Sequence, residues 1–154
     1  MRAHYIVTVA INNKYYNFVC ADLQFTVKYK VEIPSGIAPS PPPIDVSFPA
    51  DSTAQRVMEI AANMSNQYQF TVTYYGSFKE YYVDKLSGVA NDTTSSYFWK
   101  YYFKPPHGVM FEPQIGINEF IIPEGNGELI FRYQHIPSPK EHGQLKHLKA
   151  MYSS

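Results

Sequence analysis

The stretch LQFTVKYKVEI at residues 23–33 alternates apolar and polar side chains along its length. The apolar residues occupy every second position: Phe25, Val27, Tyr29, Val31 and Ile33. This period of two is typical of an antiparallel strand that turns one face to a core and the other to water. The stretch therefore predicts a half-buried strand around which a sheet forms.

Further runs rich in β-branched and aromatic residues predict strands on both sides of this stretch. Upstream, residues 5–11 and 15–19 flank Asn12 and Asn13, and because asparagine tolerates positive φ they predict a tight hairpin. Five prolines between residues 34 and 43 predict an extended connection. The remaining predicted strands cover residues 44–48, 68–75, 79–86, 96–103, 115–122 and 129–134.

One helix is expected, at residues 53–64, where Ser52 and Gln55 form a capping-box pattern. Its apolar residues recur at helical spacing: Ala54, Val57, Met58, Ala61 and Met64. Because strands and helices do not alternate, the fold class is α+β, a mainly antiparallel sheet packed on one helix. We expect a single domain at residues 1–136, with the hairpin at 5–19 as an addition. A weakly anchored basic tail at 137–154 follows.

Length and charge restrict the classes of function. The chain has 154 residues, a length typical of one domain. Its 13 basic and 13 acidic residues give no net charge. This balance argues against nucleic acid as a partner, since such binding needs clustered Lys and Arg. No apolar run is long enough to predict a membrane span. The single cysteine, Cys20, excludes an intrachain disulfide and is either a small buried side chain or a covalent link to another chain or a ligand.

Catalytic and metal-binding motifs are absent from the sequence. Neither the five histidines nor the pair Glu80 and Asp84 has a spacing that predicts a metal or acid–base site, so no metal and no catalytic residue is predicted. The sequence favours a protein that is not an enzyme, with an enzyme built on an unrecognised aromatic pocket, such as a luciferase-like oxidase, left open. Asn63 and Asn91 each begin an Asn-x-Ser/Thr pattern and are predicted glycosylation sites.

Tyrosine and phenylalanine are the densest signal, with 14 and 10 copies. They gather in doublets on three predicted strands that we expect to be adjacent, at Tyr74-Tyr75, Tyr81-Tyr82 and around Trp99. Because side chains alternate along a strand, each doublet should turn one ring to the core and one outward. The outward rings predict an aromatic surface that holds either a ligand or a second copy of the chain.

From residue 32 to 133 the chain resembles the C-terminal (beta) domain of the transcobalamin and intrinsic-factor family. The resemblance rests on the helix segment ADSTAQRVMEIAANM, the loop at 87–91, the aromatic pair Phe98-Trp99 and Gly116-Ile117. It implies a β-grasp-like fold and a secreted protein, whose leader is not present in this chain. In that family the domain clamps cobalamin, so a corrinoid is the candidate cofactor, facing residues 83–86 and Phe98-Trp99.

Together these observations favour a secreted, ligand-binding module that takes a small amphipathic or planar molecule on a Tyr/Trp-rich surface. The alternative is an extracellular matrix, mucus or adhesive protein that associates with itself. The partners are accordingly a small molecule, a homo-oligomer, or both. The predicted ligand-binding residues are Tyr75, Tyr82, Val83, Asp84, Leu86, Phe98, Trp99 and Tyr101.

Overall fold

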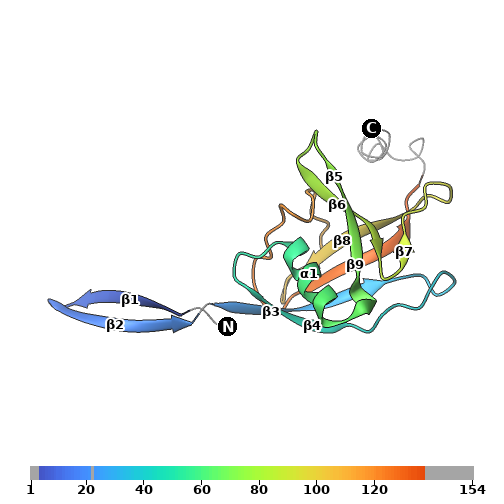
Figure 1. The fold of residues 1–154 in the computed structure, drawn as a ribbon. Coiled ribbons are helices and arrows are strands. Elements are labelled where there is room, and N and C mark those ends of the chain that lie inside the picture. Colours follow the sequence, from blue (N-terminus) through green and yellow to red (C-terminus); the bar gives the residue numbers. More distant parts are fainter. Residues whose placement is uncertain (1–3, 22, 138–154) are drawn as a thin grey trace.

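The computed structural model describes residues 4–21 and 23–137 and contains one α-helix and nine strands in these ranges (Figure 1). The strands are β1 (His4–Ile11), β2 (Lys14–Ala21), β3 (Gln24–Glu32), β4 (Ile44–Pro49), β5 (Phe70–Tyr75), β6 (Glu80–Leu86), β7 (Val89–Ala90), β8 (Tyr97–Lys104) and β9 (Glu128–His135). The helix α1 spans Ala54–Met64, and a 3-10 turn, η1, covers Asn66–Tyr68. The expected α+β class with one helix and an N-terminal hairpin is confirmed.

The strands form three sheets. The largest has the order β4-β3-β9-β8, the second has the order β5-β6-β7, and β1 and β2 form the third. All pairs are antiparallel except β3 and β9, which run parallel with Tyr29 opposite Leu129 and Val31 opposite Phe131. The expectation that the three aromatic strands are adjacent in one sheet is thus wrong in part, because β8 pairs with β9 and not with β6.

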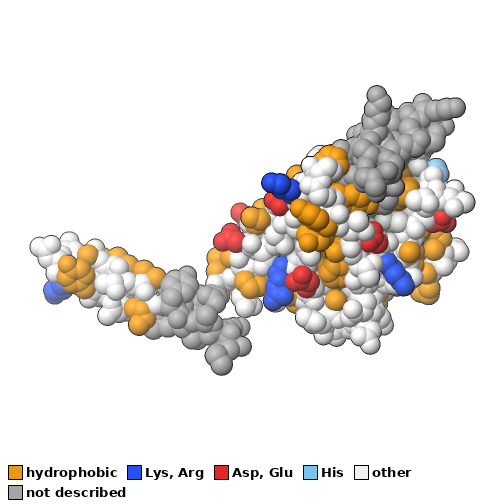
Figure 2. Space-filling model, turned by 45° about the horizontal axis from the view of Figure 1, so that its top comes forward, with side chains coloured by type: hydrophobic (Ala, Val, Ile, Leu, Met, Phe, Trp, Pro, Cys, Tyr) orange, Lys and Arg blue, Asp and Glu red, His pale blue; other side chains and the backbone are white. Residues whose placement is uncertain are grey.

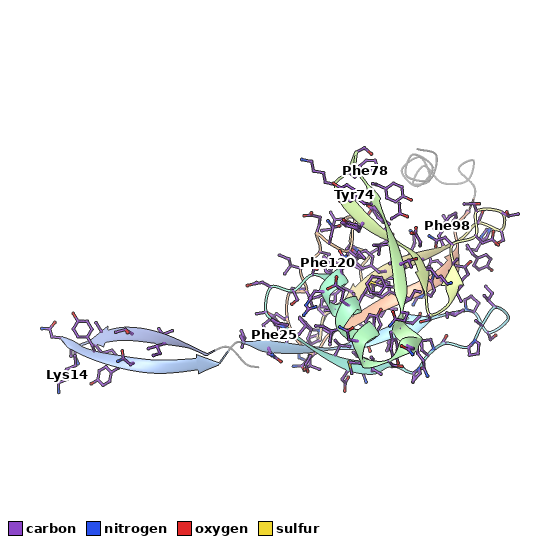
Figure 3. All side chains as sticks on the ribbon, in the orientation of Figure 1. Lys14, Phe25, Tyr74, Phe78, Phe98 and Phe120 are labelled. Carbon is purple, nitrogen blue, oxygen red and sulfur yellow. The ribbon has the colours of Figure 1, made fainter. Side chains whose placement is uncertain are left out.

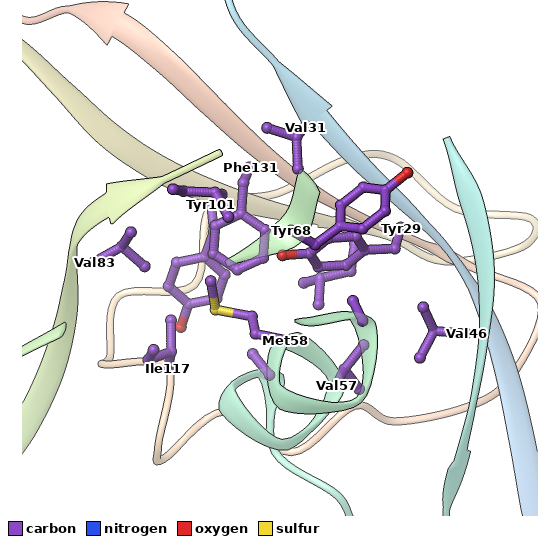
Figure 4. Packing of buried hydrophobic residues seen from close by; sticks show 14 of the residues in the cluster. Tyr29, Val31, Val46, Val57, Met58, Tyr68, Val83, Tyr101, Ile117 and Phe131 are labelled. Atoms are coloured by element: carbon purple, nitrogen blue, oxygen red, sulfur yellow. The ribbon is translucent and has the colours of Figure 1, made fainter. Parts of the chain in front are cut away.

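The predicted strand at residues 23–33 has the expected two faces. Val27, Tyr29, Val31 and Ile33 are buried, and Phe25 is half-buried against the same core. α1 turns Ala54, Val57, Met58 and Ala61 toward them, and Figure 4 shows Met58 and Val57 beneath the rings of Tyr29, Tyr68 and Phe131. Burying this aromatic cluster between helix and sheet is the main force that fixes the domain.

The start of α1 differs from the sequence prediction by one residue. Thr53, not Ser52, is the N-cap, and its side chain accepts a hydrogen bond from the backbone N–H of Arg56. The Ser52 hydroxyl instead donates to the carbonyl of Pro49. Because Ser52 and Thr53 both carry a hydroxyl group, the sequence did not distinguish which of them is the N-cap. Ser52 instead stabilises the turn between β4 and α1.

The predicted strand at residues 115–122 is wrong. This segment folds back on itself, with the N–H groups of Glu119 and Phe120 donating to Gly116, and pairs only through a single bridge between Ile121 and Thr53. Its carbonyls accept from the first turn of α1: Ala54 N–H donates to Phe120 and Gln55 N–H to Ile117. The segment therefore satisfies the free N-terminal N–H groups of the helix, which a sheet position would not allow.

The predicted strand at 68–75 begins two residues later than expected. Tyr68 closes η1 rather than opening a strand, and its hydroxyl donates to the carbonyl of Pro42 in the proline-rich connection. Its ring meets the ring of Tyr29 edge to face with centroids 5.8 Å apart. This tyrosine joins the connection to the core, a role that only the tertiary contact reveals.

Replacing Tyr29 with phenylalanine should raise the free energy of unfolding by about 1 kcal/mol, because an unpaired buried hydroxyl is costly. The Tyr29 hydroxyl has no hydrogen-bond partner among the described residues, and burial raises the pKa of this phenol. Urea unfolding followed by fluorescence measures the change. The matched control is Tyr68→Phe, which removes the bond to Pro42 and should lower stability by a similar amount. A loss of stability in Tyr29→Phe would contradict the prediction.

Candidate functional site

β6 and β8 belong to different sheets, yet their edges are joined through one side chain, that of Asn91. The Asn91 amide nitrogen donates to the carbonyl of Val83 at 2.9 Å, and its oxygen accepts from the backbone N–H of Trp99 at 2.8 Å. The Asn91 backbone N–H also donates to the carbonyl of Asp84. Asn91 thereby holds together the two strands that carry most of the predicted ligand-binding residues.

At its beginning, near Tyr81, the same edge of β6 is hydrogen-bonded to the turn at residues 116–118. Ile117 N–H donates to the carbonyl of Tyr81, while Tyr81 N–H donates to the side-chain oxygen of Asn118 at 2.8 Å. The close approach leaves no room for a side chain at Gly116, where a Cβ would lie 2.7 Å from the Cβ of Glu80. The turn that caps α1 thus also positions β6.

Four of the eight predicted ligand-binding residues are members of the hydrophobic core: Val83, Leu86, Trp99 and Tyr101. Leu86 is fully buried. The indole N–H of Trp99 donates to the carbonyl of Val89, and the Tyr101 hydroxyl donates to the carbonyl of Ile115. Their polar atoms are therefore engaged inside the domain, and any contact with a ligand stays a prediction for these four.

The other four, Tyr75, Tyr82, Asp84 and Phe98, lie outside the core cluster, on the outer side of β5, β6 and β8. We call this group the aromatic seam. The Tyr75 and Tyr82 rings meet edge to face with centroids 5.7 Å apart. Tyr75 and Phe98 are nearly covered, at 9% and 8% exposure, whereas Tyr82 and Asp84 are half-buried. Figure 3 shows Phe98 on the sheet and Tyr74 and Phe78 toward the tip of the β5–β6 hairpin.

Two carboxylates, Asp84 in the seam and Glu80 next to it, accept hydrogen bonds from hydroxyl groups. The Tyr82 hydroxyl donates to Glu80, and the Thr73 hydroxyl donates to Asp84 at 2.6 Å. Burial raises the pKa of Tyr82, and the bond to Glu80 raises it further; burial and then the charge of Asp84 raise that of Tyr75. Both phenols are therefore neutral at physiological pH, and the seam combines neutral rings with anionic hydrogen-bond acceptors.

Each tyrosine doublet was predicted to turn one ring to the core and the other outward, and the pair Tyr74-Tyr75 departs from this in which ring is exposed. Tyr74 is 50% exposed while Tyr75 is nearly covered, even though Tyr74 lies on the same face of the hairpin as Tyr81, which packs against the core. The two rings of Tyr74 and Tyr81 are 4.9 Å apart. The hairpin extends beyond the core at this point, so its inner face becomes exposed toward the tip (Figure 1).

A shallow depression of about 400 Å³, which the sequence did not predict, opens where β3 and β9 end and β8 begins. Tyr97 and Tyr133 form an aromatic wall with centroids 5.4 Å apart, and Tyr133 also contacts Trp99 at 5.2 Å. An ion pair between Glu32 and Arg132, at 2.7 Å, lines another side. These two residues are 100 positions apart, so only the parallel pairing of β3 with β9 brings them together.

The remaining predicted sites are placed as follows. Asn63 is exposed near the end of α1, whereas Asn91 is half-buried and its amide is hydrogen-bonded, so Asn63 is the more accessible of the two predicted acceptors. Cys20 lies in β2 opposite Tyr5, and its side chain falls outside what the structure describes. Of the predicted tail, only Pro137 is described. In residues 4–21 and 23–137 no three His, Cys, Asp or Glu side chains gather in a metal-binding arrangement.

The fold places the domain in a structural class that contains haptocorrin, a protein of the transcobalamin family. A crystal structure of haptocorrin in complex with Cbi (cobinamide) aligns with 75% of this chain at a TM-score of 0.62 and 17% sequence identity. The chain spans 26% of the length of that protein. The fold implied by the sequence resemblance is thus confirmed. No family model and no curated protein matches the sequence.

Among the described residues, no helix has the length and apolar character needed to cross a membrane.

Proposed function

We propose that this chain is a secreted, non-enzymatic module that binds a small planar ligand, with a corrinoid as the leading candidate, along the aromatic seam. The observation that carries the proposal is the fold shared with haptocorrin, whose structure was determined with Cbi bound. The family assignment, the extracellular location and the ligand are parts of this proposal.

The chemistry of the seam supports a planar, amide-bearing ligand. The half-buried ring of Tyr82 offers an apolar face, and Glu80 and Asp84 beside it provide anionic acceptors for ligand N–H groups. A corrinoid combines a flat macrocycle with amide groups at its rim. Because the chain has no net charge, stacking and shape rather than charge attraction would supply the affinity.

Titration with hydroxocobalamin or cobinamide should shift the corrinoid absorbance and quench Trp99 fluorescence. Trp99 is the only tryptophan and contacts Val89 and Tyr133 next to the seam, so its emission reports on this part of the domain. Replacing Tyr82 with alanine should weaken binding by about 2- to 12-fold, the loss of one aromatic contact worth roughly 0.5–1.5 kcal/mol. Tyr82→Phe keeps the ring and should bind nearly as well as the parent.

The matched control is Tyr74→Ala, which removes an exposed tyrosine from the opposite face of the same hairpin and should leave affinity unchanged. No spectral change at high micromolar protein would eliminate the corrinoid. Equal effects of Tyr74→Ala and Tyr82→Ala would show that ligand binding does not use the seam.

A further inference from the structure

The β1–β2 hairpin exposes large apolar side chains on both faces. The exposed ones are Ile6, Val7, Val9, Ile11, Tyr15 and Tyr16, with Ile6 at 69% and Tyr15 at 78% exposure. Figure 2 shows hydrophobic side chains along the arm, which extends away from the rest of the domain (Figures 1 and 2). This much exposed apolar surface on one element usually marks an interaction site.

The hairpin also lacks the support that a two-stranded sheet needs. Eight residue pairs join β1 to β2, from His4 with Ala21 to Ile11 with Lys14, but neither strand pairs with another described strand. Isolated two-stranded hairpins are at best marginally stable in water and normally require further strands or a packed face. A partner that covers these apolar side chains would therefore stabilise the arm.

We propose that this partner is a second copy of the chain and that the β1–β2 arms form the interface of a homodimer. The six exposed side chains amount to roughly 600 Å² on each chain, if a large side chain has about 150–250 Å² in full exposure. They are divided between two faces, with Val7, Val9, Ile11 and Tyr16 on one and Ile6 and Tyr15 on the other, so two arms must wrap around each other to cover them all. Such an intertwined contact removes about 1,200 Å² from the two copies, which is at the lower limit of specific interfaces. A dimer with a dissociation constant in the micromolar range is the expected consequence.

Charge favours a second copy over a charged partner. Within residues 4–21 Lys14 is the only formally charged residue at neutral pH, and it lies next to the turn, at the end of the arm. Two arms can approach without electrostatic repulsion, while an anionic membrane or an acidic protein would find a single cation to bind. The position of the arm, clear of its own domain, also leaves room for a symmetric partner (Figure 1).

Substitutions on each face of the arm test the interface. Val9 faces the same side as Tyr16, while Ile6 is on the opposite side, so Val9→Lys and Ile6→Lys place a charge on either face. Sedimentation velocity from 1 to 100 µM, in reductant so that Cys20 cannot cross-link chains, should show the parent reaching twice the 17.7 kDa chain mass. At least one variant should raise the dissociation constant by about 10-fold or more, since a buried ammonium is costly.

Val109→Lys is the matched control, the same exchange at an 86% exposed valine outside the arm, and it should dimerise like the parent. Trp99 fluorescence checks that each variant keeps its folded domain, because Trp99 is in the core. A monomeric parent at 100 µM would overturn the proposal. So would a dimer unaffected by both Val9→Lys and Ile6→Lys, or co-sedimentation of a monomer with phosphatidylcholine vesicles.

Discussion

Replacing Asn91 with alanine should lower the free energy of unfolding by about 3 kcal/mol. The substitution leaves the carbonyl of Val83 and the N–H of Trp99 without their side-chain partner. Each buried backbone group that loses its hydrogen bond costs roughly 1–3 kcal/mol. Because both groups lie at the junction of β6 and β8, the expected effect is far larger than for an ordinary loop residue.

Urea unfolding followed by the emission of Trp99 measures this effect at the strand that loses the bond. The matched control is Asn63→Ala, since Asn63 is exposed on α1 and should change stability by less than about 0.5 kcal/mol. If Asn91→Ala were as stable as Asn63→Ala, the two sheets would be held together by the core and by the bonds from Trp99 and Tyr133 to the carbonyls of Val89 and Ala90. The Asn91 bridge would then have no structural role.

Replacing Gly116 with alanine should lower the free energy of unfolding by about 2–3 kcal/mol, the usual cost of forcing a group into a packed site. The added Cβ would lie 2.7 Å from the Cβ of Glu80 and 2.9 Å from the carbonyl oxygen of Tyr81. Neither atom is at the end of a flexible side chain, so the turn must move away from β6. That movement would also disturb the bond from Ile117 N–H to Tyr81.

Gly36→Ala is the matched control, because nothing lies within 4 Å of a Cβ at that position. It should leave stability unchanged or raise it slightly, since alanine restricts the unfolded chain. Thermal unfolding of the two variants side by side separates the steric effect from the general exchange of glycine for alanine. Equal midpoints would contradict the close packing of the 116–118 turn on β6.

Local patterns predicted the elements whose partners are near in sequence. The pair Asn12-Asn13 predicted the hairpin turn, and both residues have positive φ, 49° and 61°, as a two-residue β-turn of this kind requires. The helical spacing of Val57, Met58 and Ala61 predicted the buried face of α1. In each case the information sits within one element or one turn, so alternation and turn chemistry suffice.

Contacts between distant segments could not be predicted this way. The segment at 115–122 is rich in isoleucine, as strands often are, yet its carbonyls accept hydrogen bonds from the free N–H groups of α1 and form a capping turn. The aromatic doublets predicted a concentrated surface, but the core takes up Trp99 and Tyr101, and Tyr82 remains half-buried on the seam. Which ring is covered depends on where the core ends, and that is a property of the assembled layers.

By itself, the sequence determined the α+β class, the N-terminal hairpin, the helix and the buried face of β3, because each follows from a repeat of two or 3.6 residues. The tertiary structure alone decided that β3 pairs in parallel with β9, about a hundred residues away, and that β8 belongs to that sheet rather than to β6. The tertiary structure also showed that Asn91, a predicted glycosylation site, forms hydrogen bonds to both β6 and β8. The physical reason is that a backbone hydrogen bond can be satisfied by many partners, and only packing of the whole chain selects one.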